Sequence, residues 1–317
     1  MECSEDEPIR ALSGHPVRGA GFTLVELLVS ISIMSLLAGI LVPVLGRVRE
    51  KAFEVQSMNN LRLIGSNLSV YANDSQGFFP PSVATVGNWE NWNWYDPRRL
   101  VGSQHRTPRH RRSMSMYLKN YVNVESLHCP SAPDEYKYLK DMWEAGDEWD
   151  NPDTLREKDP MSGSYCYFWG YDSVALVDQR KRLFKGPRRP SGGRKYSTLL
   201  ACDFFGYSGG YDPSPPRTYA SCERMALGKE GSTQLLAPYW SGVSEILEQP
   251  LDAEYPDVKH LPKMRLKAVF VDGHVQNYTE QDVVALDVIS NRKTYETFGI
   301  DTSDTPGLFF IPRDAVE

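Results

Sequence analysis

The stretch from Leu27 to Leu45 contains no charged side chain, and this feature constrains the chain more than any other. At about 1.5 Å of rise per residue, a helix over this stretch is roughly 29 Å long, close to the hydrocarbon thickness of a bilayer. A helix in the core of a soluble protein rarely stays apolar on every face for that long. The sequence therefore predicts a membrane-spanning helix over residues 22–45.

A glycine lies just before this apolar segment, at the Gly21-Phe22 junction. A secretory leader is cut after its apolar region, whereas a cut here would leave the membrane helix on the mature protein. The segment GFTLVE with its apolar run resembles the processing site of type IV prepilins and type II secretion pseudopilins. The resemblance implies that a prepilin peptidase removes a leader over residues 1–21, and that the same enzyme methylates Phe22.

Glu26 and Pro43 are the two unusual residues of the apolar segment. A carboxylate in an apolar helix is costly if it has no partner. The resemblance implies that Glu26 pairs with the positive N-terminus of a neighbouring subunit during filament assembly. A simpler alternative is that Glu26 reaches the headgroup region from the helix end. Pro43 matches a proline that the family carries late in this segment, and we expect a kink or local melting there.

The helix is expected to continue beyond the membrane, over residues 46–76. Its apolar residues recur at steps of three and four, as on one face of a helix. These residues are Val48, Ala52, Val55, Leu61, Ile64, Leu68 and Tyr71. The pattern ends at Asn73–Gly77, before two consecutive prolines. We therefore predict one long helix whose second half needs a partner surface.

The remaining residues, 77–317, form many short segments separated by glycine and proline. Aromatic and branched residues bounded by turns predict strands at Tyr165–Tyr171, Ser197–Phe205 and Leu235–Trp240. The expected fold class is α+β and pilin-like, with the long helix packed on a loop-rich antiparallel sheet domain.

The clearest strand pair is a terminal hairpin over residues 265–278. Alternating branched residues flank Asp272-Gly273. A type I′ turn requires positive φ at both central residues, and Asp-Gly is one of the dipeptides that adopt it readily. This region, with the segment NNLRLIGSNLSVYANDSQGFFP, resembles a pseudopilin-like family of envelope proteins that ends in a His-x9-Asp-Gly signature. His260, Asp272 and Gly273 match it with eleven intervening residues instead of nine. An insertion around Pro262 would account for the difference.

Composition and motifs argue against several other functions. The formal net charge of −6 is not typical of a protein that binds nucleic acid in bulk. The sequence lacks the nucleophile elbow, P-loop, zinc-protease and dinucleotide motifs, so we expect neither an enzyme nor a cofactor. His260, Asp272 and His274 are competent metal ligands, but the turn and the hairpin strand explain the last two, and we predict no metal site. The acidic turn Asp301–Asp304 is a weak calcium candidate.

Two alternative functions remain open. Trp89, Trp92 and Trp94 could stack on sugars, which would make the chain a membrane-anchored module that binds envelope glycans. Aromatic residues in a loop more often cover a core, and we favour that interpretation. The basic segment Arg98–Arg112 could contact DNA, as in a DNA-capturing minor pilin. The negative net charge instead favours a solvated loop neutralised by the acidic stretch Asp141–Asp159.

Four cysteines follow the leader: Cys129, Cys166, Cys202 and Cys222. Outside the cytoplasm they could form two disulfides in any of three connectivities, and free buried thiols are an equal alternative. The resemblance implies a single-pass protein of the bacterial inner membrane, with the leader cytoplasmic and the globular domain in the periplasm or in an extracellular filament. Its expected partners are the prepilin peptidase and methyltransferase, membrane lipid and other pilin or pseudopilin subunits.

Overall fold

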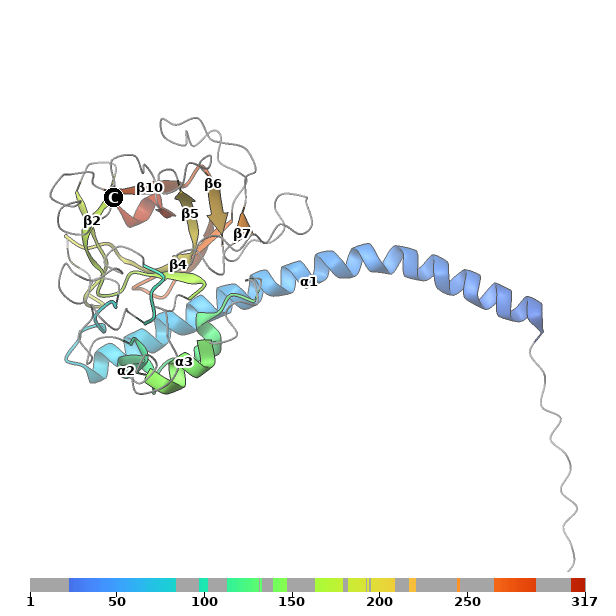
Figure 1. The fold of residues 1–317 in the computed structure, drawn as a ribbon, viewed down its shortest axis with the longest axis horizontal. Coiled ribbons are helices and arrows are strands. Elements are labelled where there is room, and N and C mark those ends of the chain that lie inside the picture. The colour runs from blue at the N-terminus through green and yellow to red at the C-terminus, as the bar shows by residue number, and fades with distance from the viewer. Residues whose placement is uncertain are drawn as a thin grey trace, which may run out of the picture. The chain divides into compact units, whose positions relative to one another are not determined.

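The computed structural model describes residues 23–83, 97–101, 113–130, 132, 139–146, 163–178, 182–191, 193, 195–208, 217–220, 244–245, 265–288 and 309–316. The chain divides into two compact units, Met1–Glu50 and Lys51–Glu317. The first unit contains the beginning of helix α1 (Leu24–Asp74), and the second contains the rest of that helix and a sheet domain (Figure 1).

Helix α1 is continuous from Leu24 to Asp74 and includes Pro43. The backbone thus shows no local melting at this proline; the predicted kink stays a prediction. The helix ends two residues before the expected boundary, in a cap built by Gln76 and Gly77 at φ 56° and 79°. The Gly77 N–H donates to the Ala72 carbonyl at 2.7 Å, which satisfies one of the last helical carbonyls.

Among the described residues the strands form two sheets, and every neighbouring pair is antiparallel. The four-stranded sheet has the order β1 (Tyr165–Tyr167), β4 (Leu199–Asp203), β8 (Leu266–Phe270) and β9 (Val275–Tyr278). The seven-stranded sheet has the order β3 (Leu183–Lys185), β2 (Asp172–Val177), β10 (Val283–Val288), β11 (Phe309–Pro312), β5 (Phe205–Ser208), β6 (Arg217–Ala220) and β7 (Ser244–Glu245). This arrangement confirms the α+β, pilin-like prediction.

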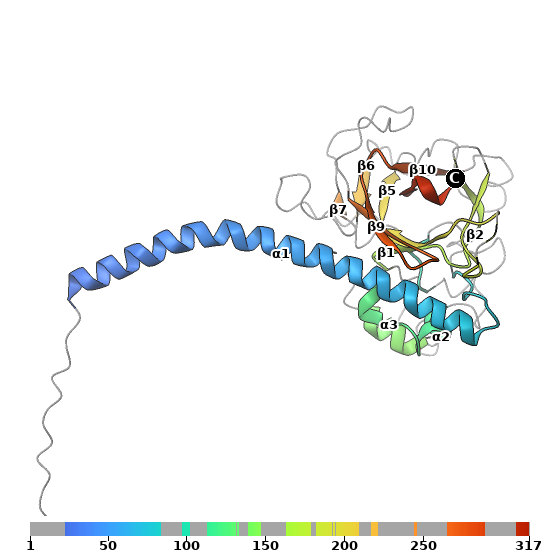
Figure 2. The same cartoon turned by 180° about the vertical axis from the view of Figure 1, so that it is seen from behind.

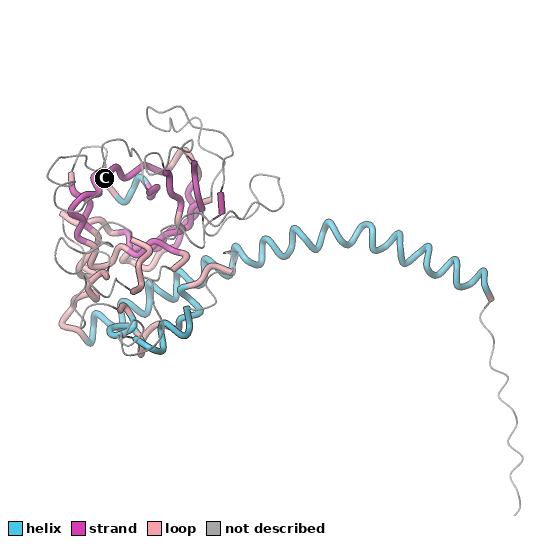
Figure 3. The backbone as a smooth tube through the Cα atoms, in the orientation of Figure 1, coloured by secondary structure: helices cyan, strands magenta, loops and turns pink. Residues whose placement is uncertain are grey.

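Short helices complete the described part of the domain. They are α2 (Ser115–Leu118), η2 (Val124–Leu127), α3 (Leu139–Ala145) and η7 (Arg313–Ala315). Figures 1 and 2 show α2 and α3 on one side of the second half of α1 and the strands on its other side. The tube in Figure 3 shows the same separation, with the magenta strands gathered away from α2 and α3.

Strands β1, β4 and β8 of the four-stranded sheet are buried along their whole length. Along β1 and the residue after it, side chains alternate between two hydrophobic cores, as the period of two in a strand requires. Tyr165 and Tyr167 belong to the core shared with α1, whereas Cys166 and Phe168 belong to the core shared with the seven-stranded sheet. This sheet is therefore the middle layer between α1 and the larger sheet.

The buried face of α1 begins later than the sequence pattern predicts. Leu61, Ile64 and Leu68 are fully buried, as expected, but Val48 and Val55 are 58% and 66% exposed. The prediction of burial for these two valines is therefore wrong. On this part of α1 the residues that contact the sheet are polar: Glu54 Oε1 accepts from Asn277 Nδ2 at 3.5 Å, and the Ser57 hydroxyl lies 3.1 Å from the Tyr165 hydroxyl.

The terminal hairpin is confirmed, but its turn type is not. Asp272 lacks the positive φ that a type I′ turn requires, and only Gly273, at φ 84°, has it. The Gly273 N–H donates to the Phe270 carbonyl at 2.9 Å, and the Phe270 N–H donates to the His274 carbonyl at 3.2 Å. A loop with one more residue than a type I′ turn thus joins the strands, closed by a left-handed glycine that forms a bulge.

The other predicted strands are partly confirmed. Only Tyr165–Tyr167 of the first is a strand, because the chain turns at Gly170, where φ is 61°. An added Cβ at Gly170 would lie 2.3 Å from the Pro80 carbonyl oxygen, so this turn needs glycine. The segment Ser197–Phe205 holds β4 and the start of β5. Leu235–Trp240 lies outside the described residues.

We predict that Gly65→Val destabilises the sheet domain. Helix α1 approaches β8 so closely at Gly65 that an added Cβ would lie 2.8 Å from Val269 Cγ2. Overpacking of a core typically costs about 1–3 kcal/mol. The measurement is thermal unfolding of the full chain in detergent, with Ser66→Val as control because Ser66 lies on the exposed face of the same turn. Equal melting temperatures for the two variants would contradict a tight contact between α1 and β8.

Candidate functional site in the N-terminal helix

Helix α1 starts with a capping box formed by Thr23 and Glu26. The Glu26 Oε2 accepts hydrogen bonds from the Thr23 backbone N–H at 2.9 Å and from its hydroxyl at 2.7 Å. In return, the Glu26 N–H donates to Thr23 Oγ1 at 3.2 Å. These bonds satisfy donors that the first turn of a helix otherwise leaves without partners. The sequence analysis missed this role, although the spacing Thr-x-x-Glu before an apolar run is its known signal.

The capping box gives Glu26 two separable properties. Its oxygen atoms serve as local hydrogen-bond acceptors, and its carboxylate is a negative charge at an exposed position. The two residues of the predicted processing junction, Gly21 and Phe22, lie outside the described residues. Their assignment therefore depends on the sequence.

The apolar part of α1 has no protein around it within this single chain. In the described part of the chain, α1 alone is long and apolar enough to cross a membrane, and none of its most apolar window is buried. Leu24, Met34 and Leu36 are 73%, 68% and 68% exposed. Such a surface is stable only in lipid or against other apolar helices. The segment is therefore consistent with a membrane anchor.

Two of the three serines of the apolar segment have hydrogen bonds within the helix. Ser30 Oγ donates to the Glu26 carbonyl at 2.7 Å, and Ser32 Oγ donates to the Leu28 carbonyl at 2.8 Å. Because the helix itself satisfies both hydroxyls, they carry little of the cost of an unpaired polar group in lipid.

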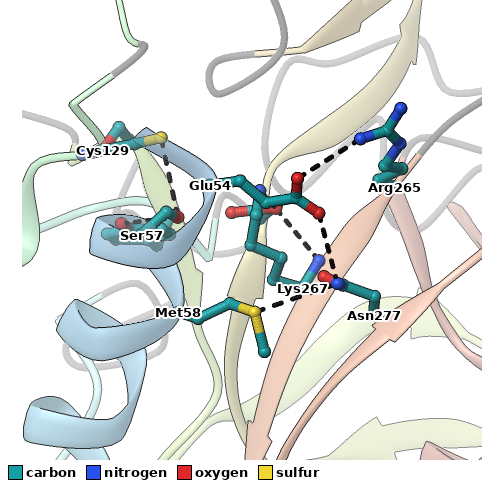
Figure 4. A network of polar contacts seen from close by, with 10 residues as sticks. Glu54, Ser57, Met58, Cys129, Arg265, Lys267 and Asn277 are labelled. Atoms are coloured by element: carbon teal, nitrogen blue, oxygen red, sulfur yellow. Dashed lines mark hydrogen bonds and ion pairs between the residues drawn. The ribbon is translucent and has the colours of Figure 1, made fainter. Parts of the chain in front are cut away.

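Glu54 is the centre of a polar network where α1 meets the terminal hairpin (Figure 4). Its Oε2 accepts from Lys51 Nζ at 2.7 Å and from Arg265 Nη1 at 3.3 Å. Its Oε1 accepts from Asn277 Nδ2 at 3.5 Å. The hydrogen bond from Lys51 is the largest effect and lowers the pKa of Glu54; partial burial opposes it, and the charges of Arg265 and Lys267 add to it.

Behind this network lies a buried ion pair between adjacent strands. Lys267 Nζ is 2.9 Å from Asp203 Oδ2, with 8% of the lysine side chain and none of the aspartate side chain exposed. The Lys267 backbone N–H also donates to Asp203 Oδ2 at 3.0 Å. A buried pair of this kind destabilises the fold strongly when one partner alone is removed. The pair is a structural link between β4 and β8.

The structure explains Asp272 through its contacts inside the turn. Its Oδ1 lies 2.6 Å from His274 Nδ1 and accepts the His274 N–H at 3.1 Å, while the imidazole stacks on Phe270 at 4.4 Å. Desolvation would raise the pKa of Asp272, but the bonds from His274 bring it below its usual value. In the described part of the chain, no three His, Cys, Asp or Glu side chains gather where they could hold a metal ion.

Two of the arginines in the proposed DNA-contact segment are buried. Arg98 is 1% exposed and Arg99 is 7% exposed, and the Arg98 guanidinium lies 4.3 Å from the centre of the Phe204 ring. The expectation of a solvated basic loop is therefore wrong for these two residues. The delocalised guanidinium can stack on an aromatic ring, which allows its burial.

The other predicted contact residues, Trp89, Trp92, Trp94 and His260, lie outside the described residues. So do Arg106, Arg109, Arg111 and Arg112 of the basic segment, and the acidic turn Asp301–Asp304. The glycan-binding hypothesis therefore remains a prediction from sequence, as does any role of His260.

A capped, membrane-capable helix followed by an antiparallel sheet domain defines an α+β protein with a pilin-like fold, whose first helix is consistent with a membrane anchor. Residues 18–42 match the family model of the prokaryotic N-terminal methylation motif, a span that includes Gly21, Phe22 and Glu26. The match supports a protein of the prepilin and pseudopilin type, which implies processing by a prepilin peptidase and assembly with pilin-type subunits in general. It does not reach the C-terminal His–Asp-Gly residues, whose family resemblance stays a prediction.

Searches of curated proteins and of solved structures gave no match.

We predict that acid weakens the sheet domain through Glu54. Because the folded-state pKa of Glu54 is lowered from about 4.5, its contribution to stability is present above that pH and is lost as the pH falls through the folded-state pKa. Thermal melts of the full chain between about pH 6 and about pH 3 should show a smaller acid-induced loss in Glu54→Gln than in the wild type. Glu144→Gln, in an exposed pair 3.9 Å from Lys140, serves as control. Identical acid profiles for wild type and Glu54→Gln would contradict this role.

Proposed function

We propose that this chain is a pilin-like subunit of a type II secretion or type IV pilus-like filament and not an enzyme. The observation that carries the proposal is the match of residues 18–42 to the N-terminal methylation motif. In this proposal a prepilin peptidase hydrolyses the Gly21-Phe22 bond and the new N-terminus is methylated. The mature chain then joins other pilin or pseudopilin subunits through α1.

The position of the cap supports this proposal physically. A cut after Gly21 creates an amino group one residue before Thr23, at the beginning of α1. A positive charge there is unfavourable, because the N-terminus of a helix already carries partial positive charge. The Glu26 carboxylate of a neighbouring subunit would offset both charges in a site without water. Assembly would at the same time cover the exposed apolar surface of α1.

The proposal also sets the arrangement in the cell. The leader would lie in the cytoplasm and α1 would cross the inner membrane once. The sheet domain would then face the periplasm or the filament exterior. The apolar window of α1 and the position of the motif before it support this arrangement.

We predict that Gly21→Ala blocks processing. A methyl group at this position would meet the peptidase cleft where glycine permits close approach of the backbone. Intact-mass measurement of membrane-extracted protein should show a wild-type chain that begins at methylated Phe22 and a variant that retains residues 1–21. Gly19→Ala, in the same leader, is the matched control and should be processed. A normally shortened Gly21→Ala chain would overturn the assignment of the cleavage site.

A second prediction separates the cap of Glu26 from its charge. Glu26→Gln keeps an oxygen that can accept the Thr23 hydrogen bonds but removes the charge, whereas Glu26→Ala removes both. We expect both variants to be cut, and both to capture a tagged wild-type subunit at least about tenfold less well, a factor equal to about 1.4 kcal/mol. Thr23→Ala, which keeps the charge, should retain most of the capture. If Glu26→Gln captures as well as wild type while Glu26→Ala does not, the role of Glu26 is only to cap the helix.

A further inference from the structure

Cys166 and Cys202 lie directly opposite each other in the middle sheet. They are register partners in the antiparallel pair of β1 and β4. Directly opposite residues of such a pair have Cα atoms about 4.5–5.5 Å apart. A disulfide bridges Cα atoms about 4.4–6.8 Å apart, so the backbone already has the spacing that the bond needs.

The two side chains also face the same way. Both are fully buried in the core between the two sheets. The next residue across the sheet from Cys202 is Ala268, whose small side chain leaves the sulfur atoms space in this row. The pair is thus oriented as well as spaced for a covalent link.

Cys129 has a different environment. It belongs to the core shared with α1, and its Sγ donates to Ser57 Oγ at 3.7 Å (Figure 4). The middle sheet lies between that core and the one that holds the pair. The structure therefore discriminates between the three described thiols, which are all buried, in a way that spacing along the sequence does not.

We propose that Cys166 and Cys202 are a modification site that forms a cross-strand disulfide between β1 and β4 when the chain folds in an oxidising compartment. In the cell this rests on the proposed function, because that function places the sheet domain outside the cytoplasm.

The oxidant is a disulfide carrier, either a protein or a small molecule. One cysteine thiolate attacks the carrier disulfide and releases a carrier thiolate. The second cysteine then attacks the mixed disulfide, which releases the other carrier thiolate and leaves the Cys166–Cys202 bond. Both cysteine protons pass to the carrier thiolates, so two thiols are oxidised and one carrier disulfide is reduced.

The order of events follows from burial. Desolvation, reinforced by the neighbouring Cys166 thiol, raises the pKa of Cys202 well above its ordinary value. Since the thiolate is the attacking species, a buried thiol of this kind exchanges slowly. Oxidation therefore precedes closure of the core, and the finished disulfide is shielded from reductants.

The test begins with the full-length protein in cells. Free thiols are blocked with N-ethylmaleimide at lysis, and the membrane-extracted chain is digested without reductant and mapped by mass spectrometry. The expected result is a linked pair of peptides that contain Cys166 and Cys202, with Cys129 alkylated. The link should survive in Cys129→Ser and disappear in Cys202→Ser, which should show alkylated Cys166.

A second arm separates failure of this inference from failure of the proposed function. Protease added to spheroplasts reports whether the sheet domain lies outside the cytoplasm. Alkylated Cys166 and Cys202 in a domain that the protease reaches would overturn the disulfide. If the protease does not reach the domain, the proposed orientation is wrong, and refolding of the purified full chain in detergent with oxidised and reduced glutathione decides the disulfide. A linked pair there supports it, and alkylation of both cysteines or a link to Cys129 overturns it.

Discussion

The packing of α1 onto the four-stranded sheet is the interaction on which the described domain depends. That sheet has no solvent-facing side in its centre, because its residues alternate between the core under α1 and the core of the larger sheet. Gly65 lets the helix approach β8 closely, and Ser57 anchors it to Tyr165 on β1. Loss of this contact would expose one whole face of the middle layer, and burial of apolar area is the dominant favourable term in folding.

The residue types on the surface of α1 change along its length, and the change occurs around Lys51 and Glu54. From Leu27 to Leu45 the helix carries no charged side chain and exposes large apolar side chains on every face, which suits lipid or neighbouring helices. From Ser57 onward only one face is buried. Between these two parts, Glu54 forms an ion pair with Lys51 on the same helix and a second one with Arg265 of the sheet domain. A charged network at this position marks where α1 passes from an apolar environment to a folded domain.

Local patterns predicted the elements well and the contacts between distant segments poorly. The helix, its end near Asn73 and the hairpin at Asp272-Gly273 all depend on neighbouring residues, and the structure confirms each of them. The turn type was wrong because the loop length depends on strand register. The burial of Arg98 and the ion pair between Lys267 and Asp203 join residues far apart in sequence, for which spacing gives no signal. Of the candidate site, the sequence identified the processing motif but missed that Glu26 caps its own helix.

The two proposed modifications lie in different compact units of the chain. The proposed cleavage and methylation would act before the first turn of α1, whereas Cys166 and Cys202 lie in the core between the sheets. The middle sheet separates that core from the one that α1 helps to build. In the proposed function, processing would determine whether the helix can assemble, while oxidation would determine how firmly β1 and β4 hold together.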